Sequence, residues 1–308
     1  MNLMKVFSPI EMLEATCDLA SLIPFGSARE KFNGLSHLFE HFLIANFYKI
    51  GIRAGFTTED YIMFFFEKMY PGYFIGRLKK LGFNKEIIES EKEKIKEEIY
   101  EKKLDNEERF FKIIWQNTIY SKSPIGNVTD VNKISVKDLE KLRKEILKMP
   151  LYFFKRNGSV IIFNRSSNKK RKYMGLKITH RKHEFKKRFY DVYYFNGESE
   201  KLFLLKNMLQ SVNSKKHIQL SEKKKMSALI IERGSRFLNK SDFAKLRETA
   251  IREITKKSDR MNFYEKAIKE LESIYFYNKS WVERIDKLLH TSSDDIINIM
   301  NKIEILTN

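Results

Sequence analysis

The sequence predicts an α+β protein made of two related units. The 308 residues are enough for about two domains that each bury a core of their own. With 42% hydrophobic and 13% aromatic residues, the composition excludes a disordered chain. Each half of the chain opens with strand-like segments and continues into helices, and this shared order is the reason for expecting two related units.

The first strand and helix come from contrasting patterns. Apolar and polar residues alternate over 13–24, which predicts a strand with one face on a core and with Cys17 as a buried small hydrophobe. Asn33 or Gly34 can cap a helix that runs to about Lys49. That helix is apolar around most of its circumference, so we expect it to be buried on several sides.

The rest of the first half predicts a hairpin and several helices. Residues 52–66 are rich in β-branched and aromatic side chains, which favours a strand or a hairpin. Ser135 to Asp138 resembles a capping box. Helices are predicted at 67–81 with an interruption at Pro71-Gly72, at 85–103, after a cap at Asp105-Asn106, and at 136–149, and a short buried strand is predicted at 159–164.

The second half of the chain also combines predicted strands with predicted helices. Strands are predicted at 189–195 and 226–232, where β-branched and aromatic residues cluster. We expect a first domain over 1–165, a basic linker over 166–186 and a second domain over 187–308. Helices are predicted at 199–211, 241–256, 259–277, 280–290 and 293–303.

The positive charge is unevenly distributed. The net charge of +19 favours a nucleic-acid or anionic-membrane partner at first sight. Eleven Lys and Arg against one Glu lie within 165–188, so this stretch alone carries +10. Its only aromatic residues are Tyr173 and Phe185, too few for base-stacking platforms. We expect a solvated linker here, with binding of a polyanion as the open alternative.

The chain is expected to be soluble and cytoplasmic, with no membrane span. Charged residues interrupt every hydrophobic stretch before it reaches the roughly 18 to 20 residues of a membrane-spanning helix. The N-terminal residues lack the pattern of a secretory signal. Cys17 is the single cysteine, so no disulfide within the chain is possible.

Three polar residues stand out on the apolar helix. His37, Glu40 and His41 occupy positions i, i+3 and i+4 and therefore share one face. Two imidazoles one turn apart can both bind one zinc ion, and the carboxylate beside them can handle the proton of a water molecule. The alternative is a chance occurrence of a short motif. A buried polar trio is costly without a partner, which favours the metal.

A longer pattern around this trio resembles the M16 family of metallopeptidases, the inverzincins, which includes pitrilysin, insulin-degrading enzyme and the mitochondrial processing peptidase. The resemblance covers about residues 10–165 and is only topological beyond them. It depends on Gly26, Ser27, Glu30, Gly34, Leu35, the trio itself, Gly-Phe-Thr-Thr at 55–58 and Ser123-Pro124-Ile125-Gly126. The fold that it implies is two α/β-sandwich units, each a mixed sheet covered by helices, with the second unit shortened.

The resemblance also implies a site. His37, His41 and Glu98 would bind one Zn²⁺ per chain, and Glu40 would be the general base. Glu91 would orient a zinc-binding side chain from two helical turns away. Glu97 and Glu101 are alternatives to Glu98, but the register of the family favours Glu98. The peptide substrate would bind as an added strand along Ala54, Gly55, Phe56 and Thr57.

The activity that the resemblance implies is a zinc-dependent endopeptidase for short or unfolded peptides, such as a leader or precursor peptide. The chain would form a homodimer, or a heterodimer with another M16-like chain. Ala54 stands where the family usually has Asn, and the family's substrate-binding Arg and Tyr of the second domain are not found. The alternatives are a non-catalytic or partner-dependent subunit, and a polyanion-binding protein. His180 and His183 lack a nearby Cys or acidic cluster to complete a metal site and are expected to be solvated or linker histidines. Nothing is assigned to His217 and His290.

Overall fold

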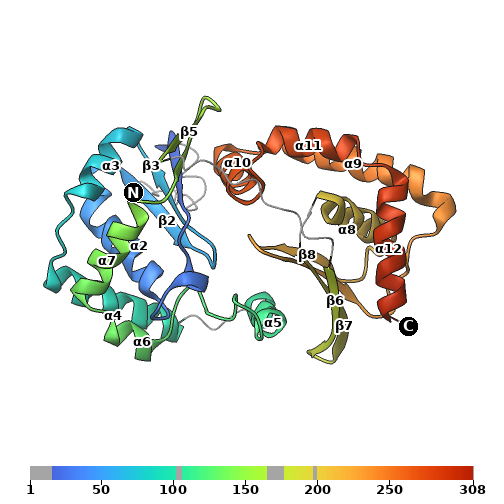
Figure 1. The fold of residues 1–308 in the computed structure, drawn as a ribbon, viewed down its shortest axis with the longest axis horizontal. Helices are drawn as coiled ribbons and strands as arrows, with labels where there is room; N and C mark the ends of the chain where they lie inside the picture. The colour runs from blue at the N-terminus through green and yellow to red at the C-terminus, as the bar shows by residue number, and fades with distance from the viewer. Residues whose placement is uncertain (1–15, 102–105, 165–176, 197–199, 308) are drawn as a thin grey trace, which may run out of the picture. The chain divides into compact units, whose positions relative to one another are not determined.

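The computed structural model describes residues 16–101, 106–164, 177–196 and 200–307. Antiparallel sheets combine with helices, which confirms the predicted α+β class (Figure 1). The chain divides into two compact units. Unit 1 comprises Met1–Asn168 with Asn262–Leu271, and unit 2 comprises Lys169–Met261 with Glu272–Asn308.

The sheet of unit 1 has five strands in the order β2-β3-β1-β4-β5. Every pairing in it is antiparallel, so the mixed sheet implied by the family resemblance is wrong for the described strands. The strand β4 was not predicted, and the predicted hairpin at 52–66 is confirmed as β2 and β3. The bounds are β1 (Leu19–Ile23), β2 (Ile52–Thr57), β3 (Ile62–Phe66), β4 (Leu151–Lys155) and β5 (Val160–Phe163).

The central strand β1 differs from its prediction. It begins at Leu19, and all five of its residues are buried. Leu19 and Ile23 belong to the main core, whereas Ala20 lies on the opposite face because side chains alternate along a strand. That opposite face is also covered: the ring of Phe65, which pairs with Ala20, stacks on Tyr264 at 4.8 Å. Alternation therefore predicted the strand but not the burial of both its faces.

Six α-helices and two short 3₁₀ turns complete the described part of unit 1's first segment. In Figure 1, α2, α3, α4 and α7 gather on one side of the sheet, where their apolar residues form one core with β1 and β3. Pro71 begins its helix instead of interrupting it, as expected for proline in a first turn. The bounds are α2 (Leu35–Phe47), α3 (Pro71–Lys79), α4 (Lys85–Glu101), α5 (Asn106–Trp115), α6 (Val128–Lys133) and α7 (Val136–Ile146).

Unit 2 has a four-stranded antiparallel sheet in the order β6-β7-β9-β8. Its core lies between one face of this sheet and the helices α8, α9, α11 and α12. The strands are β6 (Lys177–Phe185), β7 (Arg188–Asn196), β8 (Ile218–Glu222) and β9 (Ser227–Glu232). Its helices are α8 (Glu200–Val212), α9 (Phe243–Asp259), α11 (Trp281–Leu289) and α12 (Ser293–Thr307). The helix α10 (Phe263–Tyr277) is divided between the units after Leu271.

The basic stretch is not a linker where the structure describes it. Residues 177–185 form β6, which pairs with β7 along its whole length. β6 is an edge strand among the described strands, and charged side chains on an edge strand disfavour further pairing. The many Lys and Arg residues led to the prediction of a linker, although an edge strand needs apolar residues on only one of its faces. Residues 165–176 of the predicted linker lie outside the described part of the chain.

The predicted second domain also differs from the observed division. Asn262–Leu271 counts with unit 1, where the ring of Phe263 stacks on Phe154 at 6.0 Å. The guanidinium of Arg156 lies over the same ring at 4.6 Å. No described helix has both the length and the apolar character needed to cross a membrane.

Candidate metal centre

The start of α2 is fixed by a buried carboxylate. Glu30 accepts hydrogen bonds from the backbone nitrogens of Gly34 at 2.7 Å and Ser36 at 2.8 Å, and from Ser36 Oγ at 2.8 Å. These bonds satisfy donors that every helix leaves unpaired at its first turn. Burial raises the pKa of Glu30 to about 7, against the opposing effect of those hydrogen bonds.

Two glycines bring a loop against the same helix end. Gly34 and Gly126 both have positive φ, at 107° and 96°. A Cβ atom on Gly126 would lie only 2.6 Å from the Cα of Gly34, so the two backbones meet at a distance that side chains do not allow. The contact places the carbonyl of Ile125 at 3.1 Å from His37 Nδ1.

The two histidines of α2 both direct their Nε2 atoms toward Glu98. The Ile125 carbonyl can only accept a hydrogen bond, so the neutral ring of His37 carries its proton on Nδ1 and leaves Nε2 unprotonated. His41 Nδ1 lies 3.3 Å from Glu91 Oε2, which gives its neutral ring the same tautomer. Both Nε2 atoms therefore offer a lone pair, and both face Glu98.

Glu98 completes a set of three ligand atoms. Its Oε2 lies 3.5 Å from His37 Nε2, and its Oε1 lies 3.3 Å from His41 Nε2. Zinc at about 2.0 to 2.1 Å from tetrahedral ligands separates those ligands by about 3.3 to 3.4 Å. His37, His41 and Glu98 each offer one atom within 4.8 Å of the others, so the described residues fit a zinc ion.

The helix α4 supplies both carboxylates of this site. Glu91 and Glu98 are seven residues, about two turns, apart and face α2 together. Glu91 is buried and is also paired with Lys94, whose Nζ lies 2.6 Å away. Burial tends to lower the pKa of His41, but its hydrogen bond to Glu98 and the charges of Glu98 and Glu40 outweigh this effect and raise it.

Glu40 lies beside the ligand set without joining it. Its side chain is buried, and Thr57 donates a hydrogen bond of 2.6 Å to its Oε2. Burial raises the pKa of Glu40 to about 7, although the bond from Thr57 and the charge of His41 act in the opposite direction. A carboxyl group with that pKa can both accept and return a proton near neutral pH.

A cleft of about 430 Å³ opens over these groups. β2 forms one wall and is an edge strand of the described sheet, paired on one side with β3. Gly55 packs against the neighbouring strand β3, where a Cβ atom would meet the ring of Phe64 at 3.0 Å. The lining residues are His37, Glu40, His41, Ile44, Ala54, Gly55, Phe56, Thr57, Glu98, Pro124 and Ile125.

The structure therefore brings the residues singled out in the sequence into one place. The alternative ligands Glu97 and Glu101 are not part of the three-ligand group. Sequence reasoning missed the bond from Thr57 to Glu40 and the carbonyl of Ile125, because both depend on segments far away in the chain. The histidines of the basic stretch lie in unit 2, where His180 Nε2 is 2.9 Å from Asp191 and His183 Nε2 is 3.4 Å from Tyr194 Oη.

No family model matches the sequence, and no curated protein matches it. Solved structures do match. The ferredoxin protease FusC, solved as a point mutant in complex with Arabidopsis ferredoxin, superposes with a TM-score of 0.60 at 13% identity, over 93% of this chain and 44% of that one. A chain of complex III₂ from Candida albicans gives a TM-score of 0.54 at 10% identity, over 91% and 86%. A predicted insulinase family protease from Yersinia pestis gives a TM-score of 0.46 at 9% identity, over 92% of this chain and 84% of that one.

These likenesses show the fold alone. Both units of the chain are covered, since the FusC and complex III₂ matches extend over more than nine tenths of it. The chain spans less than half the length of the FusC chain.

Proposed function

We propose that this chain is a zinc-dependent endopeptidase that cleaves short or unfolded peptides. The observation that carries the proposal is the set of ligand atoms on His37, His41 and Glu98, with Glu40 beside it in the same cleft. Each partner around the set acts on protonation or orientation. Ile125, Glu91 and Thr57 contact His37, His41 and Glu40 respectively. A chance pair of histidines on a core helix would not need three such contacts.

A zinc ion bound there would lower the pKa of a water molecule and polarise the carbonyl of the scissile peptide bond. Glu40 accepts the proton of the attacking water at its carboxylate and returns it to the leaving amine. Thr57 orients Glu40 through its hydrogen bond, and Glu91 fixes the ring of His41. Each of these residues therefore has a separate task.

The substrate would bind along β2. An edge strand offers unpaired backbone groups, and main-chain hydrogen bonds tolerate many side chains in the added segment. Ala54, Gly55, Phe56 and Thr57 line the cleft. This arrangement suits an extended peptide, such as a leader or precursor, better than a folded protein surface.

We further propose that a second chain completes the enzyme, as a homodimer or as a heterodimer with another chain of this fold. This chain spans 44% of the FusC chain, whose structure is of a protease with its ferredoxin partner. A non-catalytic subunit is the second candidate function, because the fold also occurs in a chain of complex III₂. The intact ligand set in this chain favours catalysis.

The test compares wild type with Glu40→Gln. Zinc content is measured after dialysis by elemental analysis, and cleavage is followed on a library of unstructured peptides by mass spectrometry. We expect about one zinc ion per chain in both proteins, and cleavage by wild type alone. Zinc-loaded wild type that cleaves no peptide, alone or with any co-purifying chain, would contradict the peptidase proposal and favour the subunit.

A further inference from the structure

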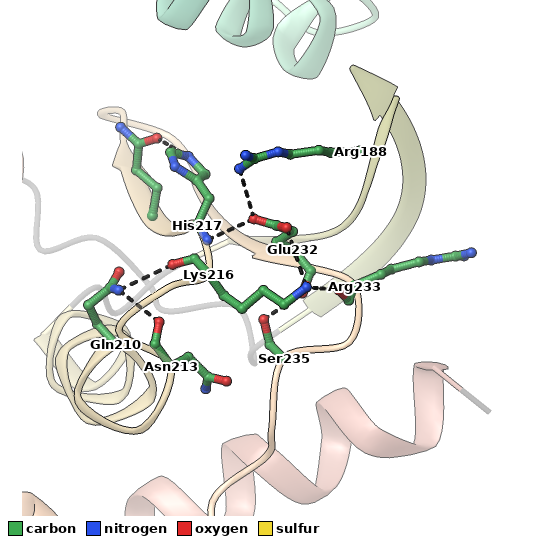
Figure 2. Close-up of polar contacts among 9 residues, drawn as sticks. Arg188, Gln210, Asn213, Lys216, His217, Glu232, Arg233 and Ser235 are labelled. Carbon is green, nitrogen blue, oxygen red and sulfur yellow. Dashed lines mark hydrogen bonds and ion pairs between the residues drawn. The ribbon is translucent and has the colours of Figure 1, made fainter. Parts of the chain in front are cut away.

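One end of the sheet of unit 2 carries a dense positive charge. Three segments meet there: 186–189 in the turn after β6 and the start of β7, 213–217 between α8 and β8, and 233–237 after β9 (Figure 2). We call these three segments together the basic platform. They contain seven Lys and Arg and no Asp or Glu: Lys186, Lys187, Arg188, Lys215, Lys216, Arg233 and Arg236.

Hydrogen bonds hold the three segments of the basic platform together. The backbone nitrogen of Arg233 donates to the carbonyl of Phe189 at 2.8 Å, and Lys216 Nζ donates to the carbonyl of Arg233 at 3.2 Å. The buried side chain of Asn213 accepts from Arg236 N at 2.7 Å and donates to Arg236 O at 2.8 Å. The charges therefore lie on a fixed surface and not on a mobile tail.

A buried carboxylate orients part of this charge. Glu232 is 8% exposed and accepts from the backbone nitrogen of His217 at 2.9 Å. Its two oxygens each lie 3.4 Å from a cation, Oε1 from Lys216 Nζ and Oε2 from Arg188 Nη1 (Figure 2). A second carboxylate, Asp191, lies 3.3 Å from Arg233 Nε. Two carboxylates against seven Lys and Arg still leave the basic platform with a positive excess.

Apolar surface lies within the same patch. Phe189 is 50% exposed and Phe237 is 37% exposed, and the guanidinium of Arg233 lies 5.9 Å from the centre of the Phe189 ring. Aromatic residues and arginines dominate the binding energy of protein interfaces. Phosphate neutralisation needs cations alone, and single strands of nucleic acid bind along grooves lined by successive aromatic rings. A compact patch with fixed arginines and an exposed phenylalanine fits a polypeptide better.

We propose that the basic platform docks a partner polypeptide with clustered Asp and Glu side chains and an apolar residue among them. The carboxylates would pair with Lys186, Lys187, Lys215 and Arg236, which are exposed, and the apolar residue would cover Phe189. Every residue of the basic platform belongs to unit 2, so this inference does not depend on the zinc site.

The probe is a fluorescein-labelled peptide of mixed Glu and Leu, and binding is measured by fluorescence anisotropy. The host is the full chain with Glu40→Gln, so that no cleavage intervenes. We expect saturable binding that weakens as salt rises, and no binding of the matched peptide with Gln in place of Glu. Lys186→Glu/Lys187→Glu and, separately, Lys215→Glu/Arg236→Glu should each weaken binding about tenfold or more.

The control is Lys245→Glu/Lys256→Glu, two exposed lysines of α9 in the same unit with the same change of charge. It should bind like the host, and thermal melting of every variant checks folding. Phe189→Ala should weaken binding severalfold with no change of net charge. Equal loss in the α9 control, no effect of Phe189→Ala, or tighter binding of a mixed-sequence single-stranded RNA at the same residues would overturn the proposal.

Discussion

Thr57 Oγ1 donates a hydrogen bond of 2.6 Å to Glu40 Oε2 and so joins the edge strand β2 to the helix α2. The bond follows from the register of the sheet. Thr57 pairs with Ile62, whose side chain belongs to the same core as α2, so Thr57 faces that helix. The base of the proposed reaction is therefore positioned by the strand along which the substrate would bind.

Removing this hydroxyl should change the pH dependence of cleavage. The bond from Thr57 lowers the pKa of Glu40, so Thr57→Val should raise that pKa further. A base works only when deprotonated, so the acid limb of the pH–rate profile should move to higher pH and the rate at pH 7 should fall severalfold. Thr57→Ser keeps the hydroxyl and serves as the control. An unchanged acid limb in Thr57→Val would show that Thr57 does not act on Glu40.

Glu40→Gln should separate proton transfer from metal binding. The amide has nearly the same shape but cannot accept the proton, so cleavage should fall by about 10² to 10⁴ while zinc content stays unchanged. Glu91→Gln is the matched carboxylate change and should lower zinc affinity by about 10-fold to 100-fold, because it weakens the partner of His41. Zinc titration with a competing chelator gives both affinities. Loss of zinc from Glu40→Gln would instead make Glu40 a ligand.

Each ligand variant should remove zinc while the fold remains. His37→Ala, His41→Ala and Glu98→Gln are expected to lose stoichiometric zinc in elemental analysis. His180→Ala is the control, because this histidine lies in unit 2 and pairs with Asp191. Zinc binding should also release protons, since the raised pKa of His41 means that a proton competes with the metal. Full zinc content in Glu98→Gln would point to Glu97 or Glu101.

Glu30 should make the metal-free protein lose stability as pH rises. Its pKa is about 7 in the folded state against an ordinary 4.5, so the folded state binds the proton more tightly. The resulting stabilisation is complete below pH 4.5 and is lost as pH passes 7, by about 3 kcal/mol at most. Glu30→Gln should remove this slope. Urea unfolding of both proteins between pH 4.5 and 7, with EDTA present, gives the free energy of unfolding at each pH. The contributions of other titrating groups cancel in the difference between wild type and Glu30→Gln. If the free energy of unfolding depended on pH in the same way in both proteins, the raised pKa of Glu30 would be refuted.

Gly126→Ala should disturb both stability and zinc affinity. The substitution places a Cβ atom against the backbone of Gly34 and forces alanine to a φ of 96°, which costs about 1 to 3 kcal/mol or more. Displacement of the loop would also move the Ile125 carbonyl from His37. Gly158→Ala is the control for φ alone, because its φ is 86° and nothing lies within 4 Å of a new Cβ. Equal losses in the two variants would assign the whole effect to φ.

Local patterns predicted what local physics determines. The trio on α2 followed from helical spacing, and the capping box at Ser135 is confirmed with Asp138 as its partner. Glu98 lies 57 positions after His41, and no periodicity links the two, so the family resemblance was needed to suggest it. Thr57 could not be assigned to Glu40 because the register of β2 shifts at a bulge between Ile52 and Ala54.

Strands were the harder part of the fold. β6 was predicted as a linker because of its high charge. β4, with Leu-Tyr-Phe-Phe-Lys, was missed because it lies between the clearer patterns of the helix at 136–149 and the strand at 159–164. The burial of β1 on both faces could not be predicted either, because Tyr264, which stacks on Phe65 of the neighbouring strand, comes more than 200 positions later. Tertiary contacts decide such cases, and the sequence near a strand does not contain them.

The spacing of Glu91 and Glu98 on α4 restricts which changes of length this chain can tolerate. Inserting or deleting one residue between them would rotate one carboxylate about 100° around the helix axis and move it about 1.5 Å along it. Glu98 would then point away from His37 and His41 while Glu91 stayed in place. The same insertion in the loop before α4 could be absorbed without turning either side chain. Variation in length among chains with this site should therefore accumulate outside the helix, even though the helix surface is mostly charged and exposed.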